Sequence, residues 1–449
     1  MNKSSVVGKI LIEGTLILKS PLLIGDGSGE TADNFRDVHA LRNLDDKPFI
    51  PGTSLCGVLR DWLTRTKPDA VTEIFGNLDA MQSSIQTDDI ELVDFDIIAR
   101  DGVRLDDVTG TVDGDGKFDF EAVERGAHGS LRLVITLRAC HSVERISKTV
   151  ALMLKKMQDG IQLGALTTKG FGLATVENLN AGFYDFCKKA DVVAWLLDKP
   201  AVKKIFPSTE ETDADQNDFV VDALFKFNSS FIVRDYDVST EKKKSSADEE
   251  NAPAVVAVAL KSRKDFVIPG TSLKGILRHR AEYIFAKLGL DPKTLDGLMG
   301  SSTTDKKIKS RFVVAESYVA PENFCEVEHR RNKIDRFTGG VIQGMLFATK
   351  PAYQKNLEPT FKLHFEIRTA AAAEAGLALF LLRDLWLGRV ALGGEKSVGR
   401  GTVSGVSAKI HFKGETYKLD ANGKVVGGEK SELEGFAAAL KNFVGGDGK

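Results

Sequence analysis

The sequence is poor in cysteine and has little excess charge of either sign. Its 449 residues include four cysteines, at positions 56, 140, 187 and 325, and no two of them form a CxxC pair. Such scattered cysteines argue against a structural zinc site and are typical of a reducing compartment. Lysine and arginine number 61 against 63 acidic residues, so the net charge is −2. This balance excludes a globally basic protein that coats nucleic acid by bulk charge, but it allows a local basic groove.

Long hydrophobic runs and common nucleotide motifs are also missing. The apolar stretch 370–382 is too short to span a bilayer, and residues 1–20 lack the apolar core of a signal peptide. We therefore expect a cytoplasmic protein. The sequence has no GxSxG, no GxxxxGK[ST] and no GxGxxG after a strand, so nothing supports nucleotide hydrolysis or dinucleotide binding. Its seven histidines form no HxH or HExxH pair, so they predict no histidine metal site.

One long motif occurs twice in the chain. Residues 50–63 read IPGTSLCGVLRDWL and residues 268–281 read IPGTSLKGILRHRA; ten of the first eleven positions are identical or conservatively exchanged. Other landmarks follow in the same order: period-two strands at 131–139 and 361–369, helical stretches at 142–159 and 370–387, and glycine-rich segments at 163–176 and 392–406. The spacing between Gly164, Gly170 and Gly172 is the same as that between Gly393, Gly399 and Gly401. The chain is therefore predicted to be a tandem duplication.

The duplication sets the predicted domain boundaries. A first domain runs over 1–206, an acidic linker over 207–221, a second domain over 222–415, and an extension with a hairpin and a helix over 416–449. The charged segment 239–253 is low in apolar residues and is predicted to be a mobile loop inserted in the second domain. Helices alternate with antiparallel-type strands in both copies, which predicts an α+β fold with a split β-α-β arrangement.

Each PGTSL segment precedes an apolar helical run. We expect a Ser or Thr hydroxyl to cap the helix, and the free N–H groups of a helix start form a ready phosphate site. The glycine-rich segments also allow close approach to phosphates, and Lys169, Lys396 and Arg400 add positive charge there. A plain β-hairpin with tight turns explains the same glycines, so both interpretations stay open.

Two further segments carry charge. The loop 25–48 is acidic, and hard divalent cations prefer oxygen ligands, although a solvated loop is the simpler interpretation. The segment 329–340, HRRNKIDRFTGG, is predicted to be a hairpin arm, with a weaker echo at 99–110. Its basic residues either grip an RNA backbone or form an exposed charged hairpin. They are Arg330, Arg331, Lys333 and Arg336.

Together these motifs resemble those of the RAMP superfamily of CRISPR–Cas proteins. The features that carry the resemblance are IPGTSLKGILR after a strand and loop, a short FG-type element, and a closing glycine-rich loop. The double copy resembles the fused double backbone subunit, from the seventh Cas family, of type III-D effector complexes. The resemblance implies two tandem RRM-like (ferredoxin-like) domains with β-hairpin thumbs. It also implies crRNA, target single-stranded RNA and other effector subunits as partners, including a large polymerase-like subunit and further backbone and small subunits.

In this family the motif helix and the glycine loop contact guide phosphates, and the hairpin thumb wedges between the guide and target strands. The matching helix positions are Ser54, Gly57 and Arg60 in the first copy, and Ser272, Lys274, Gly275 and Arg278 in the second. The RNA-binding candidates of the glycine loops and the hairpin arm are Lys169, Gly170, Lys396, Arg400, Arg330, Arg331, Lys333 and Arg336. Cys56 stands where the family usually has Lys, so the resemblance implies a weaker hold on the guide there.

The resemblance also implies an RNA-guided, metal-dependent endoribonuclease. In active family members an Asp in the loop before PGTSL cleaves target RNA with a divalent metal, here expected to be Mg²⁺. Asp37, fourteen residues before Pro51, is the first candidate for catalysis and metal binding, and Asp33 is the second. The second copy has no acid at the equivalent position near Val256, so Asp248 in the inserted loop is the best substitute.

Two other functions stay open on the sequence. A non-catalytic scaffold subunit would coat the guide while another subunit cuts. A crRNA-processing endoribonuclease would mature the precursor RNA, and His39 is the candidate in a fitting place for its catalytic histidine.

Overall fold

The computed structural model describes residues 5–27, 37–77, 82–105, 112–209, 217–235, 255–301, 307–355, 358 and 360–443. The chain divides into two compact units. The first comprises Met1–Gly102, Lys117–Thr167 and Phe171–Asp215, and the second comprises Val103–Gly116, Thr168–Gly170 and Gln216–Lys449. The predicted inserted loop 239–253 lies outside the described residues. In the described part of the chain, no helix is long and apolar enough to cross a membrane.

The first repeat is built from β1 to β10. Its elements are β1 Val6–Leu18, β2 Phe49–Ile50, α1 Gly52–Thr66, α2 Pro68–Phe75, β3 Ile85–Thr87, β4 Ile90–Glu91, β5 Ile97–Leu105, β6 Val112–Val123, β7 His128–Arg138, α3 Val143–Asp159, β8 Ile161–Gln162, the 3₁₀ turn η1 Thr167–Lys169, β9 Leu173–Asp185, α4 Lys189–Leu196 and β10 Lys203–Ile205.

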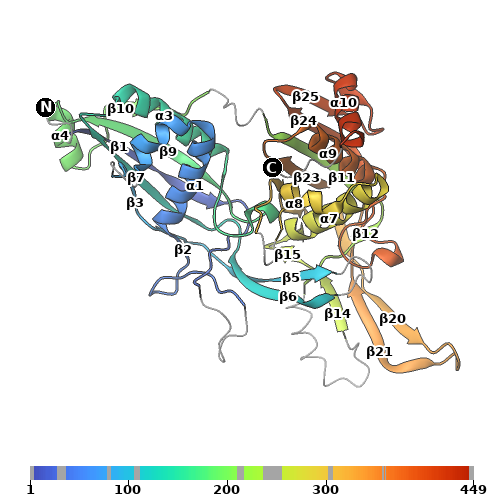
Figure 1. Cartoon of the computed structure of the whole chain (residues 1–449). Coiled ribbons are helices and arrows are strands. Elements are labelled where there is room, and N and C mark those ends of the chain that lie inside the picture. The colour runs from blue at the N-terminus through green and yellow to red at the C-terminus, as the bar shows by residue number, and fades with distance from the viewer. Residues whose placement is uncertain are drawn as a thin grey trace. The chain divides into compact units, whose positions relative to one another are not determined.

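The main sheet of the first repeat has the strand order of a ferredoxin-like fold. Its order is β10-β9-β1-β7-β3, and neighbouring strands are antiparallel. Strand β1 lies in the middle because its alternate residues, among them Ile10, Ile12 and Leu16, are fully buried. Helices α1 and α3 pack on this apolar face, as Figure 1 shows, and close one continuous core.

The second repeat runs from β11 to α10. Its elements are β11 Phe219–Phe227, β12 Ser230–Phe231, β13 Arg234–Asp235, β14 Val255–Ala259, β15 Lys261–Ser262, β16 Asp265–Ile268, α7 Gly270–Lys287, η2 Pro292–Leu295, α8 Asp296–Met299, β17 Phe312–Val314, β18 Ser317–Val319, η3 Pro321–Asn323, β19 Phe324–Glu326, β20 His329–Ile334, β21 Val341–Lys350, β22 Ala352–Gln354, β23 Phe361–Ile367, α9 Ala372–Trp386, η4 Lys396–Val398, β24 Val403–Phe412, β25 Glu415–Leu419, β26 Val425–Gly427 and α10 Lys430–Lys441.

The second sheet repeats the topology of the first. Its order is β17-β23-β11-β24, and β25 and β26 extend it beyond β24. Helices α7 and α9 contribute to its core, which is rich in phenylalanine from the central strands. The predicted fold class, two tandem RRM-like domains of mixed α and β structure, is confirmed.

The ends of the second repeat differ in detail from the predicted boundaries. Strand β11 begins at Phe219, inside the segment predicted as linker, because Phe219 and Val221 alternate into the core. The predicted hairpin and helix after residue 415 are present as β25, β26 and α10. Helix α10 packs closely on α9, since a Cβ on Gly376 would lie 2.2 Å from the Phe436 carbonyl oxygen.

The expected capping of the motif helices is wrong. Pro51 and Pro269 occupy the N-cap positions of α1 and α7, and neither helix has a side-chain cap from its own motif. Proline suits a helix start because its fixed φ matches the entry geometry and its missing N–H is not needed there. The Ser and Thr of PGTSL therefore lie within the first turn instead of before it.

Candidate nucleic-acid interface

The exposed face of helix α1 carries predicted guide-binding residues of the first copy. Gly57 and Arg60 are exposed, and Ser54 is half-buried. A Cβ on Gly57 would meet no described atom within 4 Å, so a ligand can approach the helix backbone there. The predicted phosphate site at the helix start is not open in α1, because the Gly52 N–H donates to Asp89 Oδ1 at 2.8 Å.

Lys274, on the equivalent helix α7, lies inside the second unit. Lys274 is only 6% exposed. Its Nζ donates hydrogen bonds to Ser310 Oγ at 2.7 Å and to Thr168 Oγ1 at 3.0 Å. Burial lowers the pKa of Lys274 from 10.5 to about 7, and the positive charges of Lys169, Arg278 and Arg368 reinforce the shift. To reach a guide phosphate, this ammonium would have to leave both hydroxyls.

Cys56 occupies the position of Lys274 in the first copy. It is half-buried against the first core, and burial raises the pKa of its thiol. The difference between Cys56 and Lys274 is therefore a difference in the interior of the two repeats as well as in charge.

The motif arginines of the two copies are placed differently. Arg60 is exposed on α1. Arg278 on α7 donates to Glu282 Oε1 at 2.9 Å, Asp296 Oδ1 at 2.8 Å and the Gly300 carbonyl oxygen at 2.7 Å. Three internal acceptors hold the Arg278 guanidinium, whereas Arg60 is available to a phosphate. The remaining motif positions, Ser272 and Gly275, are half-buried on α7.

The two glycine-rich loops have the same backbone geometry. Gly172 and Gly401 have φ angles of 76° and 78°, and a Cβ would lie 1.8 Å from the Leu163 oxygen or 1.9 Å from the Leu392 oxygen. The Gly172 carbonyl oxygen accepts a hydrogen bond of 2.8 Å from the Leu163 N–H. In the second loop the Gly401 carbonyl oxygen accepts the equivalent bond, also of 2.8 Å, from the Leu392 N–H. The matching spacing seen in the sequence thus reflects a tight turn that only glycine fits.

The charged residues of these loops differ in exposure. Lys396 is exposed, and Lys169 is half-buried. Burial, together with the charge of Arg278, lowers the pKa of Lys169. Gly170 and Arg400 are buried, and Arg400 Nε lies 2.7 Å from Glu395 Oε2. Of the predicted loop contacts, Lys396 is the side chain most accessible to RNA.

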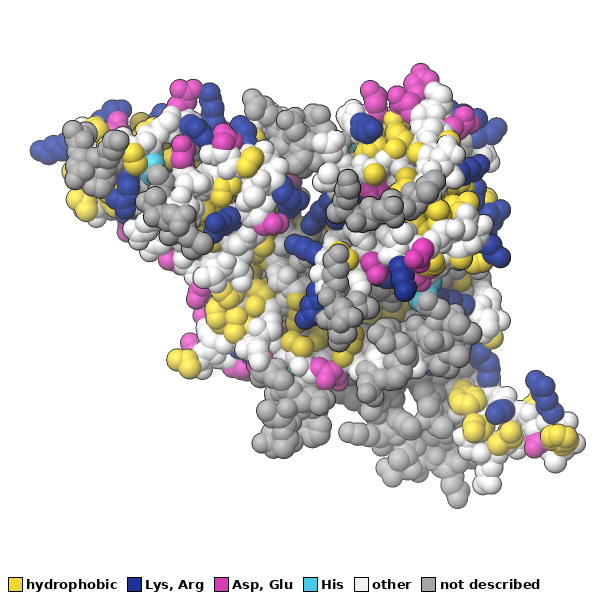
Figure 2. Space-filling model, in the orientation of Figure 1, with side chains coloured by type: hydrophobic (Ala, Val, Ile, Leu, Met, Phe, Trp, Pro, Cys, Tyr) yellow, Lys and Arg dark blue, Asp and Glu magenta, His cyan; other side chains and the backbone are white. Residues whose placement is uncertain are grey.

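The segment 329–340 comprises β20 and the turn that leads into β21, and it forms the predicted hairpin arm together with β21. Asp335 Oδ1 organises its turn by accepting the N–H groups of Phe337 at 2.7 Å and Thr338 at 3.1 Å, and these bonds lower the pKa of Asp335. Phe337 is 100% exposed at this turn. Figure 2 shows basic and hydrophobic side chains gathered on the hairpin, at the lower right of the view. The exposed basic residues of the arm are Arg330, Lys333 and Arg336.

Strands β5 and β6 pair as a hairpin in the first repeat, at the position of the predicted weaker echo. Gly102 lies directly under the ring of Phe118, because a Cβ there would be 2.1 Å from the ring Cζ atom. The turn, residues 106–111, lies outside the described residues.

Asp37 lies beside strand β6. Its Oδ2 accepts the Asp119 N–H at 2.9 Å, and its own N–H donates to Asp119 Oδ1 at 3.3 Å. The next residue, Val38, forms a parallel bridge with Phe120 and packs against the small cluster around that ring. These contacts anchor Asp37 and bring a second carboxylate, Asp119, next to it.

The other catalytic candidates are Asp33 and His39 of the same loop and Asp248 of the inserted loop in the second repeat. Asp33 and Asp248 lie outside the described residues. His39 Nδ1 is 3.5 Å from Glu121 Oε2, and its Nε2 is buried with no hydrogen-bond partner among the described residues. In the described part of the chain, no three Asp, Glu, His or Cys side chains gather as a metal site.

Two residues of this interface were not predicted from the sequence. Asp119 lies between Phe118 and Phe120 on β6, so the alternation of the strand predicts that it faces away from these rings. Its partner Asp37 is 82 positions away in sequence, and the alternation does not reveal that pairing. Glu395, inside the second glycine loop, accepts a hydrogen bond from Arg331, which is 64 positions away in sequence. Neither pairing leaves a local pattern.

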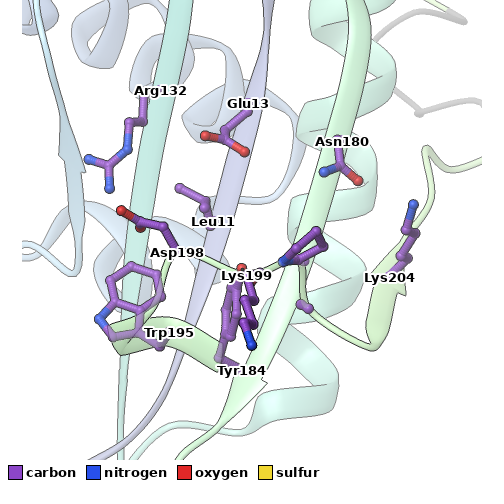
Figure 3. Close-up of a pocket in the computed structure, with 12 residues that line it drawn as sticks. Leu11, Glu13, Arg132, Asn180, Tyr184, Trp195, Asp198, Lys199 and Lys204 are labelled. Carbon is purple, nitrogen blue, oxygen red and sulfur yellow. Dashed lines mark hydrogen bonds between the residues drawn. The ribbon is translucent and has the colours of Figure 1, made fainter. Parts of the chain in front are cut away.

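A pocket of about 380 Å³ lies on another face of the first repeat, shown in Figure 3. Residues of β1, β7 and β9 and of the segment from α4 to β10 line it, including Glu13, Arg132, Asp198 and Lys204. Charges of both signs meet there, so the pocket does not favour a polyanion. None of the predicted site residues lines it.

Comparison with known protein families agrees with the duplicated site. The model of the RAMP superfamily matches two consecutive regions, residues 15–175 and 202–404. No curated protein gives a significant sequence match. The two matched regions contain both PGTSL helices, both glycine loops and both hairpins, and they cover most of the chain. The chain therefore belongs to the RAMP superfamily of CRISPR-associated RNA-binding proteins.

Proposed function

We propose that the chain is a crRNA-binding backbone subunit of a type III effector complex, of the III-D kind, that cleaves target single-stranded RNA. The observation that carries this proposal is the repetition of one interface: each repeat combines a PGTSL helix, a strained glycine loop and a long β-hairpin on a ferredoxin-like sheet. Family membership supports crRNA and other Cas subunits as partners.

The chemistry of this interface suits a single RNA strand. Exposed Arg60 and Lys396 offer positive charge to phosphates, while Gly57 allows backbone approach. Phe337, at the turn of the β20–β21 hairpin, offers a flat apolar face that can insert between bases and splay them. Sequence choice then comes from pairing between guide and target, so the protein needs no base-specific contacts.

Asp37 and Asp119 are the residues that fit a divalent cation in the first repeat. Mg²⁺ is commonly held by one or two carboxylates with substrate phosphates, and each of these two carboxylates lies against the backbone N–H of the other residue. An Mg²⁺ ion bound there would stabilise the charge that develops on the attacked phosphate. The nucleophile is the RNA's own 2′-OH, which loses its proton to water and attacks the adjacent phosphorus once the hairpin has splayed the strand. The P–O5′ bond breaks, so one product ends in a 2′,3′-cyclic phosphate and the other begins with a 5′-oxygen that takes up a proton. Asp37 is held by its backbone bond to Asp119, so its position does not depend on bound RNA.

The test uses the full chain assembled with guide RNA and its partner subunits, acting on end-labelled target RNA. Asp37→Asn should slow one cleavage product by about 100-fold or more, because it removes charge at the reacting phosphate while retaining the bond to Asp119. Target binding should not change. EDTA should abolish cleavage and leave binding intact. Asp45→Asn, an exposed acid in the same loop, is the matched control and should cleave like wild type.

A scaffold role without cleavage is the second candidate, and one observation favours it. An Asp37 oxygen already accepts a backbone N–H, so the carboxylate also has a purely structural use. Unchanged cleavage by Asp37→Asn, by Asp33→Asn and by the double variant, with the full product ladder retained, would establish the scaffold role for this repeat.

A further inference from the structure

The second glycine loop carries a carboxylate where the first carries a leucine. Leu166 and Glu395 hold the same place relative to the shared glycines, and both adopt a left-handed backbone, with φ of 55° and 56°. Leu166 packs against the apolar cluster that contains Phe120 and Phe171. The turn therefore forms without an acid, and Glu395 needs another explanation.

Glu395 lies among three arginines from separate parts of the second repeat. Its Oε1 accepts a bond of 2.7 Å from Arg331 Nη2 of β20 and lies 3.8 Å from Arg234 Nη2 of β13. Its Oε2 lies 2.7 Å from Arg400 Nε. The Glu395 side chain is only 10% exposed, so these charges are poorly screened by water.

The cluster has more positive than negative charge. Three guanidinium groups face one carboxylate, and the Arg400 side chain is 8% exposed. Its Nη1 is buried and has no hydrogen-bond partner among the described residues. Phe171, the equivalent residue of the first repeat, is 2% exposed in an apolar cluster. Burying an arginine with an unused donor is costly, which indicates that the second repeat keeps Arg400 for a ligand.

A guanidinium fork binds carboxylate and phosphate oxygens with the same planar geometry. We propose that Glu395 occupies, in the RNA-free chain, a phosphate-binding site formed by Arg234, Arg331 and Arg400. An RNA backbone phosphate displaces the Glu395 carboxylate from this site. The inference rests on the proposed guide-binding function and adds to it a built-in competitor at one phosphate position.

The displacement also couples two elements. Glu395 ties β20, through Arg331, to the glycine loop. Arg331 keeps a second bond, of 3.2 Å, to Thr349 Oγ1 of β21. When a phosphate takes the place of the carboxylate, Arg331 bonds the phosphate instead of Glu395. The hairpin is then linked to the bound RNA and no longer to the glycine loop. RNA that cannot place a phosphate there must compete with Glu395 and binds more weakly.

The direct test is the affinity of the full chain for a fluorescein-labelled single-stranded RNA, measured by anisotropy across a salt series. Glu395→Gln should bind about tenfold more tightly than wild type, which corresponds to about 1.4 kcal/mol. The slope of log affinity against log salt should steepen by about one, because RNA binding to wild type frees the Glu395 carboxylate to take up a cation, whereas binding to the variant frees no carboxylate. Arg400→Gln in the same chain should remove most of the gain.

The matched control is Glu434→Gln on α10, which makes the same charge change at an exposed i,i+4 pair with Lys430. It should bind within about twofold of wild type. Glu395→Leu, which installs the residue of the first repeat, is the second variant and should also bind more tightly. Hydrogen exchange of wild type should change at 395–398 and in β20 on adding RNA.

An affinity for Glu395→Gln and Glu395→Leu equal to or below that of wild type, in folded protein, would overturn the proposal and leave Glu395 a structural ion pair. Unchanged exchange at 395–398 and in β20 in the RNA-bound wild type would also overturn it, whatever the variants do. Wild type that binds no RNA, alone or in the complex, would instead refute the guide-binding function and this inference with it.

Discussion

At the scale of single residues, burial decides what the shared motif positions do. Lys274 and Cys56 hold the same motif position, and both side chains pack inward. For Lys274 this burial is unfavourable, because it removes the charged ammonium from water and places it near other positive charges. The lysine that the family resemblance assigns to the guide is thus a source of pH dependence in the free chain.

Lys274→Met tests this assignment through stability. Below pH 7 the ammonium is charged in the folded and unfolded states, so its burial penalty is fully present. Between pH 7 and about 10.5 the folded protein loses the proton first and the penalty falls. The unfolding free energy of wild type should therefore rise relative to Lys274→Met by about 2 kcal/mol from pH 7 to pH 9, measured by denaturant titration.

The control for this measurement is Lys293→Met, which removes an exposed lysine from the same unit. Its difference from wild type should not change with pH. A pH-independent difference for Lys274→Met as well would mean that the lysine stays charged in the folded chain.

At the scale of elements, the glycine loops show why the sequence predicted the fold well. A turn that requires positive φ, and leaves no room for a Cβ, permits one residue type, so Gly172 and Gly401 leave a readable pattern. The helix caps could not be read in this way. Asp89 reaches the start of α1 from 37 positions away, and the Asp119 partner of Asp37 comes from 82 positions away. Such pairings depend on tertiary contacts that no local pattern records.

Two glycines of the second loop separate the effects of backbone angle and space. Gly399→Ala should lower the free energy of unfolding by about 1 kcal/mol, because its φ of 83° is unfavourable for alanine. A Cβ there would meet no described atom within 4 Å, so no steric penalty is added. Gly401→Ala has the same kind of backbone angle, but its Cβ would lie 1.9 Å from the Leu392 oxygen. Gly401→Ala should therefore lower the free energy of unfolding by about 3 kcal/mol or more. Thermal melts of both variants check this order, and equal melting temperatures would contradict the loop geometry.

The β20–β21 hairpin makes a separate prediction. Phe337→Ala should weaken binding of guide–target duplex by about tenfold, because aromatic stacking on a base contributes about 1–3 kcal/mol. The measurement is duplex affinity in the assembled complex. Phe206→Ala removes another exposed phenylalanine, 72% exposed in the first repeat, and should have no effect. Equal affinities for wild type and Phe337→Ala would exclude insertion of this ring.

At the scale of the whole molecule, the two repeats share a fold but differ in chemistry. The first exposes Arg60, pairs Asp37 with Asp119, and fills its glycine-loop position with Leu166. The second holds Arg278 in internal bonds and places Glu395 among arginines. Duplication therefore preserved the PGTSL helix, the glycine loop and the hairpin in both repeats, while the side chains that they carry diverged.

The proposed function requires that each repeat holds its own stretch of one guide strand, because the interface is repeated in the two halves of the chain. Hydroxyl-radical footprinting of guide RNA in the assembled complex tests it directly, with wild type, Arg60→Ala and Lys396→Ala. We predict two protected segments, with Arg60→Ala exposing one and Lys396→Ala exposing the other. A single protected segment, or loss of the same nucleotides in both variants, would contradict the account.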